Sequence, residues 1–355
     1  MTSAALLPRA PLRHVLTGRS PLVGSRLDPA RPRGFASPIE ARVALGLPYG
    51  DLADEEAARL DSATPSARLA ALASALLAST LHSGREAPAR PHIVAARVDN
   101  LRIDEALDAL FAPPPTDRAR VVHFVHPHAL NLACVDEELR AHLARADLVL
   151  PDGVGLRLAA LILGLGLRDN LNGTDLLPLI CRRAAASGRP LVLIGAAPGV
   201  AHDAAERLRR DFPGLSIPLV AHGFLGPAEV EALTAQLDQL TDPLVLVAMG
   251  SPRQEAWIWR HLASRPRLTA LSVGGLLDFV AGRVPRAPWL WRELGLEWLF
   301  RLRQEPARLA RRYLVGNPLF VLRALRQRLC SDAGAGMSGL SIQYTACRPR
   351  PPRAR

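Results

Sequence analysis

Four short glycine-bearing segments stand out, because three of them also carry a carboxylate or carboxamide side chain that can do chemistry. The segments are Pro151-Asp152-Gly153, Gly195-Ala196-Ala197-Pro198-Gly199, Gly250-Ser251-Pro252-Arg253-Gln254-Glu255 and Gly274-Gly275-Leu276-Leu277-Asp278. Backbone N–H groups in such turns, above all where a helix begins, can face a negatively charged ligand. Any one of these segments is also typical of an ordinary turn, so only the four together predict a site.

Each segment directly follows a short β-rich run, and longer amphipathic segments separate the runs. The β-rich runs cover residues 93–98, 121–125, 147–150, 191–194, 216–221, 244–248 and 269–273, and the amphipathic segments include residues 131–143, 175–186, 200–212, 227–240 and 252–262. This alternation predicts an α/β fold with a Rossmann-like, mostly parallel sheet and helices on both faces. In such sheets ligands bind outside the carboxyl ends of the strands, where all four segments would meet.

None of the four segments matches a nucleotide-binding fingerprint. Gly195 and Gly199 lack the third glycine of G-x-G-x-x-G, and the chain has no G-x-x-x-x-G-K loop. The residues alone therefore predict an α/β enzyme that binds an anionic, phosphorylated ligand, without fixing its reaction.

Positive charge is concentrated at the two ends of the chain. The sequence has 355 residues, with 44 basic residues, all of them arginine, and 33 acidic residues, for a net charge of +11. Eleven arginines and three glutamates lie in residues 283–328, six arginines and one aspartate lie in residues 1–34, and residues 35–282 carry a net charge of −5. This distribution argues against a uniformly basic nucleic-acid binder and favours a local anionic partner, either a polyphosphate substrate or anionic lipid headgroups.

Composition divides the chain into four parts. Residues 1–90, rich in Ala, Pro, Arg and Ser with one helix expected near residues 65–81, are predicted to form a disordered or loosely helical N-terminal extension rather than a transit peptide. Residues 91–285 form the α/β domain and residues 286–330 an Arg/Trp-rich helical appendage, followed by a disordered tail over residues 331–355.

The cysteines and the apolar stretches indicate the compartment. Cys134, Cys181, Cys330 and Cys347 are far apart, which predicts a reduced cytosolic chain without a zinc site. The apolar stretch 158–167 is about half as long as a bilayer span requires. The sequence therefore predicts a protein that does not cross a membrane.

The order of seven short motifs identifies a family. The motifs are residues 146–153 (ADLVLPDG), 172–176 (NGTDL), 250–255 (GSPRQE), 273–278 (VGGLLD), 286–288 (RAP), 295–298 (GLEW) and 301–308 (RLRQEPAR). In this order they closely resemble the WecG/TagA/CpsF glycosyltransferases, from about residue 91 to about residue 325. Each motif is weak alone, but the succession is highly specific.

The resemblance implies an inverting glycosyltransferase of cell-envelope polysaccharide or exopolysaccharide biosynthesis. Family members transfer a sugar, N-acetylmannosamine or a relative, from a UDP-sugar to a polyprenyl-diphosphate-linked sugar. The implied enzyme uses no metal and no other cofactor, which agrees with the lack of a D-x-D motif here. It is expected to be cytoplasmic and peripheral on the inner face of the cell membrane.

The resemblance also implies roles for four catalytic residues. Asp152 matches the general base that takes a proton from the acceptor hydroxyl, and Arg301, Arg308 and Arg311 match appendage arginines over the UDP diphosphate. The alternatives are an ordinary Pro-Asp-Gly turn and, because Arg301, Arg308 and Arg312 fall at helical spacing with Glu305, a solvated charged helix face.

Further matching positions are expected to bind substrate. Gln254, Glu255 and Asp278 would face the uracil, ribose or sugar hydroxyls, although helix capping is an alternative for Glu255 and Asp278. Asp175 is expected either in the pocket or as a helix cap. The remaining expected substrate-binding positions are Asn172 and the loop glycines Gly153, Gly195, Gly250 and Gly275.

Three positions depart from the family pattern. His126, beside His128, stands where many relatives have the Asn of a Thr-x-Asn pair, and it is expected to replace that Asn as a polar pocket group unless it only packs in its loop. Asn170 replaces a loop arginine and Arg253 a lysine. The departures at His126 and Asn170 leave the identity of the transferred sugar open, more than the class of reaction.

All five tryptophans lie between Trp257 and Trp298, and the segment 289–300 leads into the arginine cluster. Aromatic side chains beside arginines are typical of a segment that lies on a membrane surface. The alternatives are packing of the appendage on the α/β domain and a subunit interface of a homo-oligomer. Two other functions remain open from the residues alone: a dinucleotide oxidoreductase, disfavoured by the missing fingerprint, and a nucleic-acid binder.

Overall fold

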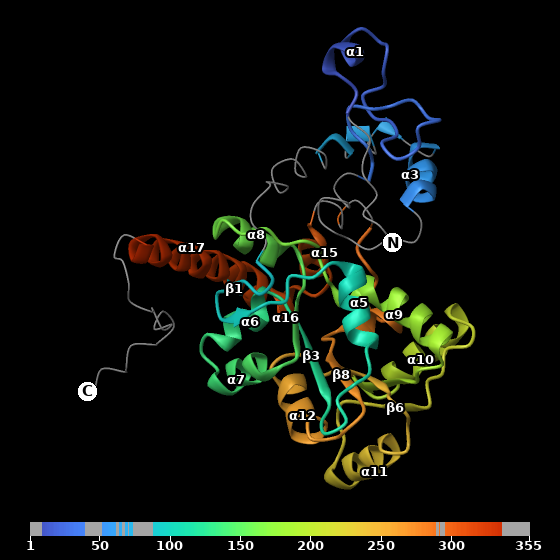
Figure 1. Ribbon diagram of the computed structural model, residues 1–355, viewed down its shortest axis with the longest axis vertical. Coiled ribbons are helices and arrows are strands. Elements are labelled where there is room, and N and C mark those ends of the chain that lie inside the picture. The colour runs from blue at the N-terminus through green and yellow to red at the C-terminus, as the bar shows by residue number, and fades with distance from the viewer. Residues whose placement is uncertain are drawn as a thin grey trace.

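The computed structural model describes residues 9–39, 52–61, 64–65, 68–69, 71–73, 88–288, 291 and 295–335. Its centre is a six-stranded sheet in the order β4-β3-β8-β7-β5-β6, in which every neighbouring pair is parallel (Figure 1). The strands are β3 (Arg120–Val125), β4 (Leu148–Pro151), β5 (Leu191–Gly195), β6 (Leu219–Ala221), β7 (Leu244–Ala248) and β8 (Thr269–Ser272). The predicted α/β fold with a parallel, Rossmann-like sheet is confirmed.

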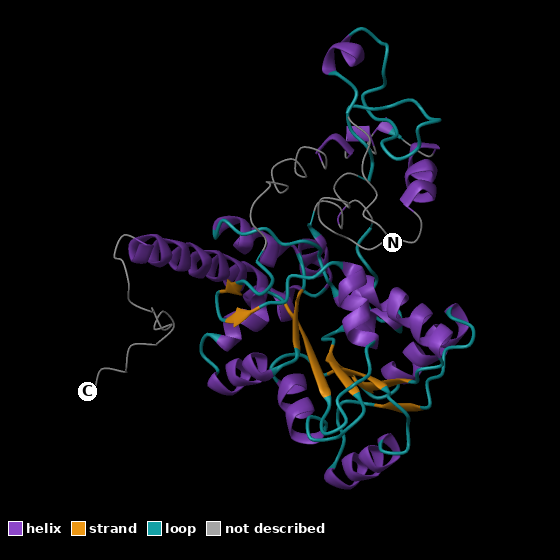
Figure 2. Ribbon diagram, viewed as in Figure 1, coloured by secondary structure: helices purple, strands orange, loops and turns teal. Residues whose placement is uncertain are grey.

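Two hydrophobic clusters fill the two faces of the sheet. Along β5 and β7 successive side chains alternate between the clusters: Val192 and Val245 point to one face, whereas Leu193 and Leu246 point to the other. This alternation follows from the two-residue repeat of a strand, and it explains why the central strands are apolar throughout. Both faces are covered by helices, as Figure 2 shows.

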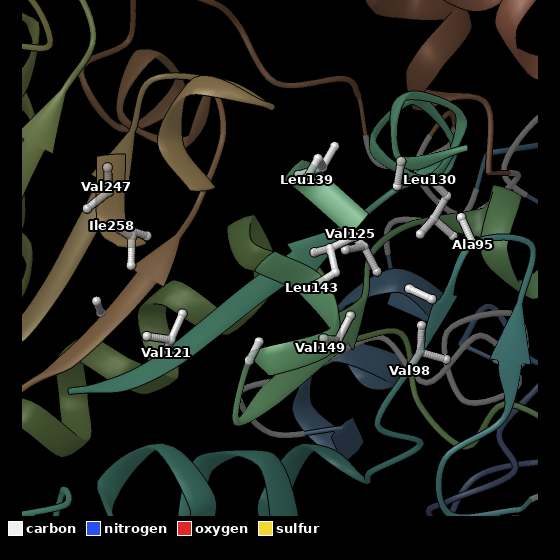
Figure 3. Close-up of a cluster of buried hydrophobic side chains, with 14 of the residues drawn as sticks. Ala95, Val98, Val121, Val125, Leu130, Leu139, Leu143, Val149, Val247 and Ile258 are labelled. Carbon is white, nitrogen blue, oxygen red and sulfur yellow. The ribbon is translucent and has the colours of Figure 1, made fainter. Parts of the chain in front are cut away.

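The helices divide between the faces according to their buried residues. The first cluster is completed by α6 (Pro127–Ala133), α7 (Glu137–Arg145), α8 (Val154–Ile162), α11 (Pro227–Leu237) and α12 (Arg253–His261). The second is completed by α5 (Ile103–Phe111), α9 (Gly173–Ser187), α10 (Val200–Asp211) and α13 (Leu276–Val280). Figure 3 shows part of the first cluster, where Leu130 of α6 and Leu139 of α7 lie near Val125 of β3.

Two predicted elements are wrong in detail. The expected strand 93–98 is a hairpin of two short antiparallel strands, β1 (His92–Ile93) and β2 (Ala96–Arg97). The expected helix 131–143 is two helices, α6 and α7, because Asp136 starts the second one by accepting a hydrogen bond from the Leu139 N–H at 2.9 Å. An aspartate at this position satisfies a backbone donor that an uninterrupted helix would bond internally.

The N-terminal part contains local structure around one buried carboxylate. Its elements are α1 (Leu12–Leu16), α3 (Leu52–Asp61) and isolated bridges between residues 23 and 36 and between residues 25 and 33. Glu56 accepts hydrogen bonds from the hydroxyls of Ser25 and Ser37, both at 2.5 Å. Of the helix expected near residues 65–81, the described residues 65, 68–69 and 71–73 are helical, and the remainder lies outside the described residues.

From Glu297 onward the described part of the appendage is almost entirely helical. It contains α15 (Glu297–Gln304), α16 (Pro306–Ala310), the π-helical turn η1 (Arg311–Val315) and α17 (Gly316–Ala335). Pro306 occupies the first turn of α16, a position where its missing N–H costs nothing. The last helix continues to Ala335, beyond the expected boundary at residue 330.

The appendage is fixed to the α/β body along α17. Phe320 and Ala324 belong to the first hydrophobic cluster. The Asn131 side chain of α6 donates to the Gly316 carbonyl at 2.7 Å and accepts from Arg323 at 2.7 Å. At the far end, Gln327 accepts from the Val94 N–H at 2.8 Å, in the turn between β1 and β2. In the part of the chain that the structure describes, no helix is both long and apolar enough to cross a membrane.

Candidate active site at the carboxyl edge of the sheet

The carboxyl edge of the sheet gathers the segments that the sequence singles out. Asp152 follows β4, His126 follows β3, Gly274 follows β8 and Gly250 lies just after β7. These four strands are neighbours in the sheet, so their ends meet on one side of it. Gly195 ends β5, the next strand along.

Asp152 lies half-buried among charges that come from three parts of the chain. Burial, followed by the charges of Glu297 and Asp175, raises the pKa of Asp152 from its ordinary 3.8 to about 7. Arg312 and Arg301 act in the opposite direction and lower this pKa. A carboxyl group with a pKa near 7 can both hold and release a proton at neutral pH, which is what a general base or acid requires.

The three predicted catalytic arginines occupy different positions. Arg301 stacks over the ring of Phe279, with its guanidinium carbon 4.7 Å from the ring centre. Arg308 is exposed and pairs with Glu305 one turn earlier on the appendage. The charges of Arg301 and Arg308 both lower the pKa of Asp278, whereas burial, the largest cause, raises it. Arg301, Arg308 and Asp278 therefore lie close together, while Arg311 is exposed.

Two charged residues of the site were not among the predicted site residues. Arg312 is half-buried and places its Nη2 atom 3.0 Å from the Nε2 atom of His126. Glu297 is the strongest charge acting on Asp152. The helical spacing of Arg301, Arg308 and Arg312 was the available signal for Arg312, but it also suited a solvated face.

Asn172 and Asp175 fix the start of α9 and the entry to the appendage. The Asn172 side-chain oxygen accepts from the N–H groups of Thr174 and Asp175 at 2.8 and 3.1 Å, so Asn172 rather than Asp175 caps this helix. The Asp175 carboxylate accepts from the Asn172 amide at 3.0 Å and forms an ion pair with Arg286. Arg286 belongs to one of the seven family motifs, and this ion pair ties the start of the appendage to α9.

The buried side chains of Gln254 and Glu255 join the glycine loops that begin at Gly250 and Gly274. The Gln254 side-chain oxygen accepts from the Gly250 N–H at 3.1 Å and from the Gly274 N–H at 2.9 Å. Its amide group donates to Glu255 at 2.9 Å, and Ser251 donates to the same carboxylate oxygen at 2.8 Å. Gln254 and Glu255 are 2% and 1% exposed. In this conformation their polar groups hold the loops together, and their contact with a substrate stays a prediction.

Replacing Gln254 by Ala is expected to destabilise the protein, because the N–H groups of Gly250 and Gly274 both lose their acceptor. Each unsatisfied donor costs about 1–3 kcal/mol. Urea unfolding of the variant measures this loss. Gln236→Ala, on the exposed side of α11, is the matched control, and equal unfolding free energies for the two variants would contradict the role given to Gln254.

Glycine is required at these positions of the site for two different structural reasons. At Gly195 a Cβ atom would lie 2.2 Å from the Ala248 carbonyl oxygen, so only glycine allows β5 and β7 to approach this closely. Gly153 and Gly250 have φ values of 89° and 73° with open space around them, so their backbone conformation, not crowding, requires glycine. The Gly153 N–H donates to the Asn170 side chain at 2.8 Å.

The described tryptophans are packed against the protein. Trp259 stacks on His142 with ring centres 5.8 Å apart, and Trp298 packs on Tyr313, also at 5.8 Å. Trp291 packs on Phe300 at 5.9 Å. Trp289 lies outside the described residues.

At its carboxyl edge the parallel sheet gathers a carboxylate with a raised pKa and several arginines, an arrangement that suits acid–base chemistry on an anionic substrate. Residues 91–333 match the sequence pattern of the glycosyl transferase WecG/TagA/CpsF family, and the chain belongs to this family. The protein is therefore a glycosyltransferase. It is 31% identical over 191 residues to the N-acetylglucosaminyldiphosphoundecaprenol N-acetyl-beta-D-mannosaminyltransferase of Bacillus spizizenii, a match that covers 54% of this chain and 73% of the relative.

Proposed function

We propose that the protein transfers a sugar from a UDP-sugar to a polyprenyl-diphosphate-linked sugar, with inversion at the anomeric carbon. The relative's name describes transfer of N-acetylmannosamine to an N-acetylglucosaminyl-diphosphoundecaprenol, and this supports a lipid-linked acceptor and an N-acetylmannosamine-like donor sugar here. The observation that carries the proposal is the placement of Asp152 after β4 at the carboxyl edge of the sheet, near Arg301 and Arg312 of the appendage, and its raised pKa agrees with this role.

In the proposed reaction Asp152 takes the proton of the acceptor hydroxyl while the acceptor oxygen attacks the anomeric carbon of the donor. The bond from that carbon to the diphosphate breaks, and its electron pair leaves on the diphosphate oxygen. Arginines stabilise this developing charge, since a guanidinium stays protonated and can hold two phosphate oxygens at once. Arg301, Arg308 and Arg311 are the proposed arginines, and their different exposure makes Arg301 the strongest of the three candidates.

A transfer assay tests this function directly. The full chain is incubated with a set of UDP-sugars and a short-chain polyprenyl-diphosphate N-acetylglucosamine, and the product is separated by chromatography and its anomeric configuration determined. We expect transfer from UDP-N-acetylmannosamine or a close relative, in the inverted configuration. A chain that binds oligonucleotides but neither binds UDP nor transfers sugar would contradict the proposal.

Contact with the inner face of the cell membrane is the second part of the proposal, and one face of α17 supports it. Leu319, Leu322, Leu325 and Leu329 of α17, with Val315 at the end of η1, are all exposed and recur at helical spacing, on the side opposite to the buried Phe320 and Ala324. The exposed Arg326 lies within this stripe. An apolar helix face with arginines is typical of a segment that lies on an anionic membrane. The packed tryptophans make α17 a better candidate than the Trp-rich segment.

Replacing Leu322 and Leu329 together by Gln is expected to reduce binding to anionic vesicles at least several-fold, because these side chains are 62% and 70% exposed and lose their apolar contact with lipid. Co-sedimentation with phosphatidylglycerol vesicles measures the effect. Phe224→Gln is the control, since Phe224 is 67% exposed but lies between β6 and α11. Unchanged binding of the double variant would move the membrane contact away from α17.

A further inference from the structure

His126 lies between two N–H donors, one on each ring nitrogen. His126 directly precedes α6 and caps it: its Nδ1 atom accepts a hydrogen bond from the Ala129 N–H at 3.1 Å. Its Nε2 atom lies 3.0 Å from Nη2 of Arg312, which comes from the appendage on the other side of the site. His126 therefore joins the sheet edge to the arginine-rich region.

The protonation state of His126 makes the second contact unusual. Burial, followed by the charges of Arg312, His128 and Arg301, lowers the pKa of His126 well below its ordinary 6.5, so the ring is neutral at pH 7. A neutral imidazole has one acceptor nitrogen and one N–H group. With Nδ1 as the acceptor for Ala129, the N–H group is on Nε2 and faces the Arg312 guanidinium. Two donors then point at one another without an acceptor between them.

Arg312 has further unused hydrogen-bonding capacity. Its Nε atom is buried and has no hydrogen-bond partner among the described residues. Burial, the largest cause, lowers the pKa of Arg312, whereas the charge of Asp152 acts to raise it. In return, the charge of Arg312 lowers the pKa of Asp152. A guanidinium that is largely removed from water and incompletely bonded favours an anionic partner.

Arg311 and Arg312 are the first two residues of the turn η1, and their side chains have different surroundings. Tyr313, the next residue, is buried and packs on Trp298 of α15, which holds this turn against that helix. Arg311 is exposed, whereas Arg312 reaches across the site to His126. The inward arginine of this pair is thus Arg312.

We propose that the Nε2–H of His126 and the guanidinium of Arg312 form a two-donor clamp for an oxygen of a diphosphate. The diphosphate oxygen supplies the acceptor that these two donors lack, and the clamp lies beside Asp152, where a diphosphate would meet the general base. This inference rests on the proposed function, and the diphosphate belongs either to the nucleotide of the donor or to the lipid of the acceptor. In the first case the clamp also stabilises the charge that appears when the bond to the sugar breaks.

Binding to the full chain tests the clamp with His126→Ala and Arg312→Gln. Calorimetry with UDP, UMP and inorganic pyrophosphate measures the nucleotide side, and the KM for a short-chain polyprenyl-diphosphate sugar measures the lipid side. Loss of a charge-assisted hydrogen bond is expected to weaken diphosphate binding about 10–100-fold in Arg312→Gln, with a smaller loss in His126→Ala. Arg303→Gln is the matched control, because Arg303 is an exposed arginine of α15.

The two arms distinguish the source of the diphosphate. Weaker binding of UDP and pyrophosphate, with UMP binding little changed, assigns the clamp to the nucleotide, and a raised acceptor KM alone assigns it to the lipid. If both variants fold, as circular dichroism and thermal unfolding report, and bind like Arg303→Gln in both arms, the clamp is overturned. The same holds if Arg312→Gln only shifts the pH profile, since Arg312 would then act on Asp152 alone. Failure of the unaltered chain to bind UDP or transfer sugar counts against the proposed function, whereas clamp-dependent pyrophosphate binding would still support the clamp.

Discussion

Asp152→Asn is expected to reduce turnover about 10²–10⁴-fold, the usual contribution of a general base. Asparagine keeps the size of the side chain but cannot take the proton of the acceptor hydroxyl. UDP binding is expected to remain close to that of the unaltered protein, because the arginines are untouched. Steady-state kinetics and calorimetry with UDP measure the two quantities separately, and substantial turnover by the variant would remove Asp152 from the role of base.

The same residue predicts the pH dependence of the reaction. A general base acts in its deprotonated form, and the pKa of Asp152 is raised to about 7, so kcat/KM should rise with pH and level off above about pH 7. Glu297 raises this pKa, so Glu297→Gln should move the rise to lower pH. Arg301 lowers it, so Arg301→Ala should move the rise to higher pH. A rise that stays in place in both variants would show that another group titrates.

Combined replacement of Arg301 and Arg308 by Ala is expected to lower turnover about 10²–10³-fold, comparable with removing a donor that stabilises developing negative charge. Both charges lower the pKa of Asp278, so the two arginines act on one region of the site. Single-turnover transfer assays with saturating donor measure the effect.

The control for the double variant is Arg303→Ala, which removes an exposed arginine from between the two positions. Normal turnover by the double variant would refute a role for either arginine in catalysis. It would also direct attention to Arg312, which the same helical spacing placed with the other two.

The strands, and the gathering of the glycine segments at their carboxyl edge, could be predicted from sequence because they depend on local patterns. A buried parallel strand is apolar on both faces, and the turn from a strand into a helix often needs glycine. Residues 244–250 show both patterns, so a strand and the turn after it can be predicted there from sequence alone. The hairpin at residues 92–97 was missed because its two strands have only two residues each, too few to show a period.

The roles of single side chains depended on contacts across the fold. The Gln254 oxygen collects N–H groups from the ends of two different strands, and no sequence spacing indicates that both are within reach. Arg311 and Arg312 are neighbours in sequence, and only the π-helical turn and the buried Tyr313 decide which one faces the site. Local patterns therefore predict where the glycine loops gather, whereas the contacts of the charged groups there follow only from tertiary structure.

The boundary between α/β domain and appendage is a change in composition and not a boundary of folding. Phe320 and Ala324 of α17 fill the same hydrophobic cluster as Val192 and Val245 of the sheet, so loosening α17 would expose that cluster to water. Cooperative unfolding is the consequence: the last helix and the sheet should lose their amide protection against hydrogen exchange together. Because α15, α16 and η1 come directly before α17 in the chain, the same burial of α17 also holds one end of the arginine-rich segment against the core.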